Sequence, residues 1–197
     1  QLDQAERGFS FQKDGPLDMR MDRRQTLSAS EWLAQVEEKK LAEVLRLLGQ
    51  ERHANRIAHA IVLQRKNKPF TRTLALADLI ASLLPKAGKK HPATRSFQAI
   101  RMFINQELAQ LETALQDSWF ALAKGGHLVV LSFHSGEDSL VKHMLHGDSQ
   151  HPKRRMQIPS RGAEGWKRLK VAKKPSALEV AANVRARSVV LRAASRC

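Results

Sequence analysis

The sequence contains a single cysteine, Cys197, and it is the last residue. One terminal thiol excludes an internal disulfide framework and a cysteine-based zinc cluster, and it agrees with a reducing compartment such as the cytoplasm. Tyrosine is absent and aromatic residues make up only 5% of the chain, which argues against an RNA binder built on stacked aromatic side chains. No apolar run approaches the length of a membrane span, and the first residues are polar and acidic, so a membrane or export function is disfavoured.

Two features that hold a nucleoside cofactor in a doubly wound α/β domain are also missing. No glycine-rich turn follows a predicted strand, and no acidic residue ends a second strand. Gly125 and Gly126 come before their predicted strand, not after it. The chain begins with Gln1 instead of methionine and opens directly into a dense motif. We therefore expect a chain that is truncated at its N-terminus and lacks most of such a cofactor site.

Positive charge is abundant. Lys and Arg number 34 against 19 Asp and Glu, which gives a formal net charge of +15. A surplus of this size points to a polyanionic partner, because the cations neutralise phosphates. The segment 150–175 is the most basic: between His151 and Pro175 there are nine Lys or Arg and one acid, Glu164, interrupted by prolines and glycines. This pattern predicts a flexible basic loop that contacts phosphates.

The first ninety residues are predicted to be helical, without a strand. Residues 1–27 show no apolar periodicity and are expected to form an ordered loop held by other elements. Ser28 and Glu31 have the spacing of a capping box, and apolar residues recur at helical intervals as far as Gly49. Further helices are expected at 54–62 and 73–84, and one long helix at 94–122.

The remaining chain alternates helix and strand. Residues 127–134 are nearly all apolar, which predicts a strand covered on both faces, followed by a helix at 137–145. A short strand near 169–171 and a closing strand at 188–194 are also expected. This order is typical of a doubly wound α/β domain.

Polar residues form a second stripe along the helix expected at 94–122. At about 100° per residue, Thr94, Gln98, Arg101 and Asn105 lie beside the apolar stripe instead of opposite it. This position faces a groove edge, and it favours contact with RNA or with an active site over a solvated helix face.

Three segments together resemble the bacterial 16S rRNA cytosine-N4 methyltransferases, which use S-adenosylmethionine. They run from Gln1 to Asp22 (Gln-Leu-Asp, then Arg-Gly-Phe-Ser-Phe, then Asp-Gly-Pro-Leu-Asp-Met-Arg-Met-Asp), from His91 to Arg101 (His-Pro-Ala-Thr-Arg-Ser-Phe-Gln-Ala-Ile-Arg), and from Ser132 to Asp138 (Ser-Phe-His-Ser-Gly-Glu-Asp). A fourth segment, Asn183 to Ser188, follows the closing motif of the family. Val184 stands where the family usually has proline, and Gly136 stands where it usually has leucine.

The resemblance implies the C-terminal part of a class I, Rossmann-like α/β methyltransferase core with a large, mostly helical insertion. Residues 1–3 would end the first half of the core, 4–107 would be the substrate-recognition insertion, and 108–197 would be the second half. Gln1 would be the last of the S-adenosylmethionine contacts, the others lying upstream. The implied partner is the 16S rRNA of the small ribosomal subunit, and the target is a cytosine amine in its decoding centre, presented unpaired or flipped. The oligomeric state stays open, a homodimer included.

The candidate site residues follow from these motifs. His134, Ser135, Glu137 and Asp138 lie where a core strand ends, the edge at which α/β sheets bind ligands, so they are the catalytic candidates. Capping of a helix is an equally good interpretation of Glu137 and Asp138, whereas His134 has no obvious capping role and is a hypothetical cytosine contact or proton relay. The RNA-binding candidates are Arg95, Gln98, Arg101, Asn105, Lys153, Arg154, Arg155, Lys167, Arg168, Lys170, Arg185 and Arg187.

Several interpretations stay open. Asp18, Arg20 and Asp22, with Met19 and Met21, either order the loop beside Gln1 or form a salt-bridged turn with two packed methionines. The chain as a whole is either the substrate-recognition and catalytic remainder of a methyltransferase or a non-catalytic, basic RNA-binding or ribosome-associated module. A helical DNA-binding protein is suggested only by charge, because no turn spacing indicates a recognition helix.

Overall fold

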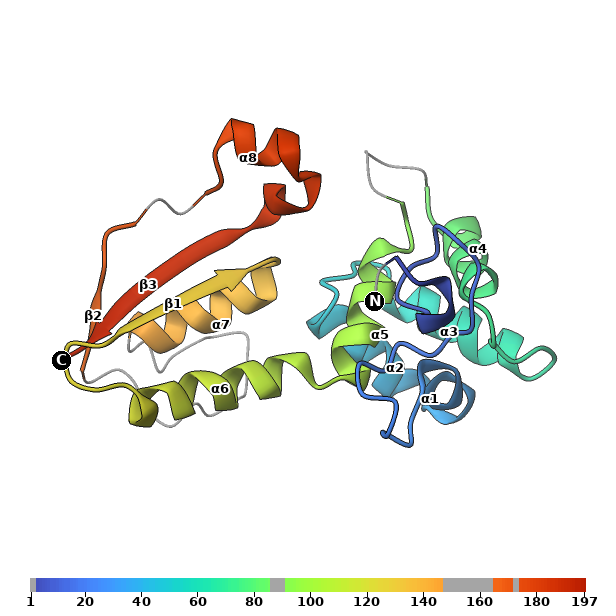
Figure 1. Ribbon diagram of the computed structural model, residues 1–197. Helices are drawn as coiled ribbons and strands as arrows, with labels where there is room; N and C mark the ends of the chain where they lie inside the picture. Colours follow the sequence, from blue (N-terminus) through green and yellow to red (C-terminus); the bar gives the residue numbers. More distant parts are fainter. Residues whose placement is uncertain (1–2, 86–90, 147–164, 172–173) are drawn as a thin grey trace. The chain divides into compact units, whose positions relative to one another are not determined.

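The computed structural model describes residues 3–85, 91–146, 165–171 and 174–197 (Figure 1). Contacts within it divide the chain into two compact units, Gln1–Glu107 and Leu108–Cys197. Among the described residues, no helix is both long enough and apolar enough to cross a membrane. Helices and a small sheet together confirm the predicted mixed α/β class, whereas the larger class I core and the role of the helical part as an insertion stay predictions.

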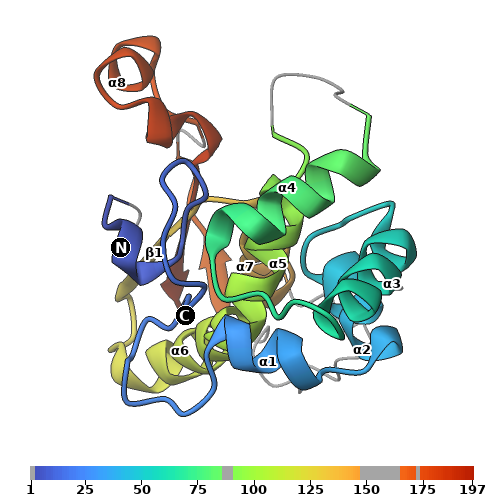
Figure 2. The same ribbon diagram turned by 90° about the vertical axis from the view of Figure 1, so that its right-hand side faces the viewer.

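The first unit is a helical bundle, as the periodicity predicts. α2 packs against both α3 and α5, and α3 packs against α4 (Figure 2). The core between them is made of aliphatic side chains, of which Leu41, Ile57, Ile80 and Ile100 are fully buried. The elements of this unit are the 3₁₀ helix η1 (Ala5–Arg7) and the helices α1 (Ala29–Gln35), α2 (Glu38–Leu47), α3 (Ala54–Arg65), α4 (Thr73–Leu83) and α5 (Thr94–Ile104).

Two of the predicted helices are broken, each by a two-residue interruption. Val36 and Glu37 are extended, with ψ of 139° and 143°, so the helix expected from Ser28 onwards is split into α1 and α2. Asn105 ends α5 and Gln106 has φ of 50°, so the helix expected at 94–122 is split into α5 and α6 (Glu107–Ala121). Apolar spacing continues across both breaks, which is why periodicity alone predicted single helices.

The loop before α1 is ordered by other elements, as expected. Leu17 and Met19 are fully buried, and the backbone of Leu17 bonds to Thr71 and to Ser30. Gly8 has φ of 70° and lies so close to the loop that a Cβ there would be 2.2 Å from the Pro16 carbonyl oxygen. Glycine is therefore required at this turn.

The second unit contains an antiparallel three-stranded sheet in the order β1-β3-β2. His127 pairs with Ser195 and Ser132 with Val190, and β2 pairs Trp166 with Arg196. The strands lie close to the predicted positions, with β2 three residues earlier than expected. The elements of this unit, besides α6, are β1 (His127–Ser132), α7 (Ser135–His146), β2 (Trp166–Arg168), α8 (Ala177–Ala182), η3 (Val184–Ser188) and β3 (Val190–Arg196).

Strand β1 is covered on one face only, so the prediction of a strand covered on both faces is wrong for the described residues. Leu128 and Val130 pack into a cluster with Val141 and Met144 of α7, which lies along this face (Figure 1). On the opposite face, Val129 is 59% exposed and Leu131 is 54% exposed. The alternation follows from the period of two along a strand.

Candidate functional site

The catalytic candidates after β1 form a helix cap. Glu137 Oε2 accepts hydrogen bonds from the backbone N–H of Phe133, at 2.7 Å, and of His134, at 3.2 Å. In return, the backbone N–H of Glu137 donates to His134 Nδ1 at 3.3 Å. This reciprocal pattern is a capping box with histidine in the N-cap position. The expectation that His134 has no capping role is therefore wrong.

The cap also fixes the ring of His134. Because Nδ1 accepts the backbone hydrogen bond, the proton of a neutral imidazole resides on Nε2, which lies 3.2 Å from Glu137 Oε1. Burial alone would raise the pKa of Glu137, but the hydrogen bonds from His134 and from the Phe133 amide together lower it below its ordinary value. Glu137 is thus an anion at neutral pH, and such a carboxylate is unsuited to act as a general acid there.

Asp138 joins α7 to the sheet. Its two carboxylate oxygens accept from Arg192 of β3 at 2.7 and 2.9 Å, and the Arg192 side chain is only 13% exposed. The hydrogen bond from Arg192 is the main reason why the pKa of Asp138 is lowered. Ser135, in contrast, opens α7 and is exposed. Of the four catalytic candidates, Glu137 and Asp138 are therefore explained by their structural contacts.

The predicted polar stripe on α5 is half-buried at Thr94, Gln98 and Arg101 and buried at Asn105, and the neighbouring candidate Arg95 is exposed. Arg101 makes a two-pronged ion pair with Glu107 at 2.7 and 2.8 Å. Asn105 is 2% exposed, and its amide bonds to the backbone of Met19, Met21 and Arg101. Asn105 thus anchors the loop before α1, and its burial disfavours the predicted contact with RNA or an active site, which stays a prediction.

Two ion pairs stabilise the loop that contains Asp18 and Asp22. Arg20 binds Asp18 through two nitrogens and also donates to the Gln25 carbonyl, and Asp22 pairs with Arg24. Met19 is buried but Met21 is 40% exposed. The interpretation as a salt-bridged turn is therefore confirmed, with one packed methionine and not two.

The remaining RNA-binding candidates lie on the second unit or outside the described residues. Lys167 and Arg168 are exposed on β2, Lys170 is exposed after it, and Arg185 and Arg187 are exposed on η3. Their binding to RNA stays a prediction. Gln1, Lys153, Arg154 and Arg155 lie outside the described residues, as does most of the predicted basic loop.

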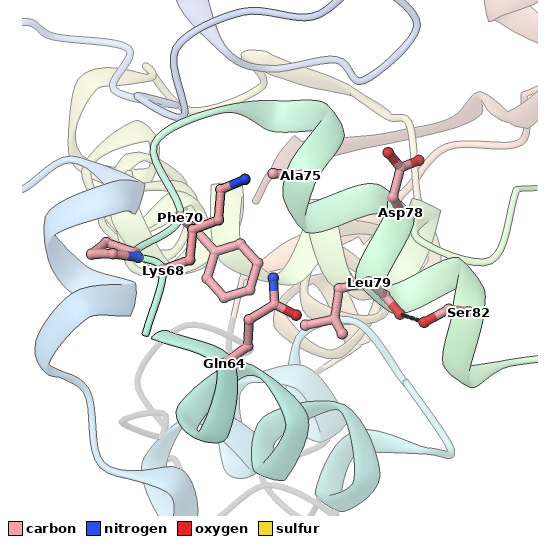
Figure 3. A pocket seen from close by; sticks show the side chains of 8 residues that line it. Gln64, Lys68, Phe70, Ala75, Asp78, Leu79 and Ser82 are labelled. Atoms are coloured by element: carbon pink, nitrogen blue, oxygen red, sulfur yellow. Dashed lines mark hydrogen bonds between the residues drawn. The ribbon is translucent and has the colours of Figure 1, made fainter. Parts of the chain in front are cut away.

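A cavity of about 300 Å³ lies in the first unit, between α3 and α4 (Figure 3). Phe70 and Leu79 supply apolar contacts, and Gln64, Lys68 and Asp78 contribute polar groups. The Ser82 hydroxyl, also at this cavity, donates to the Leu79 carbonyl oxygen at 2.7 Å. None of the lining residues belongs to the motifs that the sequence singled out, so the cavity is not the site those motifs predict.

The described residues do not fit the nucleoside cofactor that the resemblance implies. Such a cofactor needs a glycine-rich turn after a strand, where backbone N–H groups meet its polar groups. Within the described residues all strand pairs are antiparallel, and the turn after β1 is filled by the His134 and Glu137 cap. Glu137 Oε2 and His134 Nδ1 are engaged by backbone N–H groups, whereas His134 Nε2, 3.2 Å from Glu137 Oε1, has no well-formed hydrogen bond among the described residues.

Comparison with protein-family models identifies what the motifs belong to. The model described as the MraW methylase family matches residues 1–197, the full length of the chain. That span includes both units, so the match does not depend on any single motif. The chain therefore belongs to the MraW methylase family, which is the family of the 16S rRNA cytosine-N4 methyltransferases and implies S-adenosylmethionine-dependent methylation.

Proposed function

We propose that the protein methylates the N4 amine of a cytosine in the decoding centre of 16S rRNA, in the bacterial cytoplasm. The observation that carries this proposal is the family match over residues 1–197. The net charge of +15 supports an RNA substrate, because a phosphate backbone attracts a basic protein at long range.

Methyl transfer to a cytosine amine depends mainly on the alignment of the two reacting groups. The attacking amine must be held in line with the methyl group, and a proton must leave the nitrogen. Since the described residues do not form the site of the methyl donor, their contribution is to bind and orient the RNA. If the described residues orient the RNA and the methyl donor binds elsewhere, the segment after β1 is well placed to hold the target base.

Within that segment, His134 is the side chain best suited to contact the base. Its side chain is 15% exposed, and its orientation is fixed by Glu137 through the cap. Glu137 and Asp138 act as positioning residues in this proposal, because each is held by its own structural partners. Ser135, exposed at the start of α7, is the second candidate for contact with the base.

The test is a deletion of the gene that encodes the chain, followed by complementation. 16S rRNA would be purified, digested to nucleosides, and analysed for N4-methylcytidine by mass spectrometry. Loss of this nucleoside on deletion, and its return with the wild-type gene, is the expected result. Unchanged N4-methylcytidine in the deletion strain would refute the proposal.

The alternative is a non-catalytic, basic RNA-binding or ribosome-associated module, favoured by the same charge. It predicts that the chain binds 16S rRNA in vitro while the deletion leaves every methylated nucleoside unchanged. The two measurements together distinguish the functions, because only the methyltransferase links the gene to the modification.

A further inference from the structure

The loop between α2 and α3 lies against the start of α5. Arg95 donates from Nη1 to the carbonyl oxygen of Gln50 at 3.4 Å. Gly49 approaches α5 so closely that a Cβ at this position would lie 2.5 Å from the Arg95 carbonyl oxygen and 3.0 Å from the Ala99 side chain. Residues far apart in the sequence therefore meet around this loop.

Four arginines lie in this loop or on the helices next to it, and we name them the arginine cluster: Arg46, Arg52, Arg56 and Arg95. Arg46 lies in the last turn of α2 and donates to Asn55 Oδ1 at 2.6 Å, which ties it to α3. Arg52 lies in the loop, and Arg56 follows four residues later on α3. All four side chains are exposed, and none makes an ion pair with a described residue.

The one acidic residue of the loop, Glu51, is buried and so does not lie on the exposed surface that carries the arginine cluster. Glu51 is 4% exposed, and its Oε1 accepts from the backbone N–H of His53 at 2.9 Å. The first turns of α3 and α5 contain no acidic residue, whereas those of α1 and α2 contain Glu31 and Glu38. The positive ends of two helices therefore add to the field of the arginines.

We propose that the arginine cluster binds phosphates of the 16S rRNA. Four separate guanidinium groups, on three helices and one loop, fit an extended polyanion better than one small anion, and each can bind a phosphate with two hydrogen bonds. Of the four residues, only Arg95 is among the RNA-binding candidates from the sequence, and the structure adds Arg46, Arg52 and Arg56 to it. The identity of the RNA rests on the proposed function, whereas the surface itself rests on the geometry of the loop.

The test compares two quadruple variants that lose the same charge. In the cluster variant, Arg46, Arg52, Arg56 and Arg95 become Gln. In the control variant, four exposed lysines of the same unit become Gln: Lys13, Lys39, Lys66 and Lys68. Affinity for a 16S rRNA transcript is measured over a series of salt concentrations, and thermal unfolding by circular dichroism verifies that both variants are folded.

Each lost phosphate contact should reduce the slope of log K against log salt by about 0.7 and weaken binding about fivefold at 0.1 M salt. The cluster variant should therefore lose a slope of about 3, with a far smaller change in the control variant. Equal losses in both variants, or a wild-type slope in the cluster variant, would overturn the inference. So would a cluster variant that loses affinity for anionic phospholipid vesicles but not for rRNA.

The outcomes separate the cluster from the proposed function. Methylation that depends on the gene, combined with unchanged rRNA binding by the cluster variant, overturns the cluster and leaves the methyltransferase. A deletion that preserves N4-methylcytidine, combined with weak rRNA binding by the cluster variant, refutes the methyltransferase and supports the cluster. If the cluster variant unfolds, the four single Arg-to-Gln substitutions, measured in the same way, replace it.

Discussion

Substitution of Asn105 by alanine tests whether this residue serves the fold or the RNA. The side chain accepts from the Met21 N–H at 2.6 Å and donates to the carbonyls of Met19 and Arg101, both at 2.8 Å. The Arg101 carbonyl keeps a second donor, the backbone N–H of Asn105, but the Met21 N–H and the Met19 carbonyl lose the hydrogen bond that the Asn105 side chain makes. An unpaired buried group costs about 1 to 3 kcal/mol, so we expect a destabilisation of about 3 kcal/mol.

The assay is hydrogen exchange of the Met21 amide, which reports on the loop itself. A loss of about 3 kcal/mol corresponds to about a hundredfold faster exchange. The matched control is Gln98→Ala, because Gln98 is half-buried and makes no side-chain hydrogen bond within the described residues. If Asn105→Ala leaves the exchange of Met21 unchanged and instead weakens rRNA binding, the structural role assigned to Asn105 is wrong.

Three further predictions concern single side chains. Asp138→Asn should destabilise the protein by about 1 kcal/mol at neutral pH, through loss of the ion pair with Arg192. Because folding lowers the pKa of Asp138 from 3.8, the wild type has the larger free energy of unfolding above pH 3.8, and this difference fades as the pH falls through the folded-state pKa. Denaturant unfolding of both proteins at several pH values measures the difference. A difference that does not change with pH would contradict the prediction. Gly49→Ala should cost about 2 kcal/mol, since the methyl group meets the Arg95 carbonyl, and an unchanged melting temperature would refute that contact. His134→Ala should cost about 1 kcal/mol and His134→Asn should restore the cap; normal N4-methylcytidine in cells with the His134→Asn protein would show that the imidazole serves only as a cap.

Sequence periodicity located the helices but not their interruptions. Apolar residues keep their phase through Val36 and through Gln106, so nothing local separates a broken helix from a continuous one. At Asn105 the break depends on tertiary contacts, because its amide bonds to a loop more than eighty residues earlier. Such a contact has no signature in a window of neighbouring residues.

The helix cap after β1 was also missed by the sequence pattern. The capping box of Ser28 and Glu31 was predicted from its spacing and is present. His134 and Glu137 have the same spacing, but histidine is not among the common N-cap residues, so the pattern predicted a ligand contact instead. The spacing predicts this cap once any side chain with a hydrogen-bond acceptor is allowed at the N-cap position.

The arginines of the first unit show why charge must be assigned residue by residue. Arg20 and Arg101 are each held by two hydrogen bonds to a carboxylate, with side chains 22% and 25% exposed. To bind a phosphate, either one would have to give up its ion pair and leave a partly buried carboxylate without its cation, which is unfavourable. Arg52 and Arg56 carry the same formal charge without that cost. Within the described part of the chain, positive charge is thus available to bind phosphates at side chains without a carboxylate partner, such as Arg52 and Arg56.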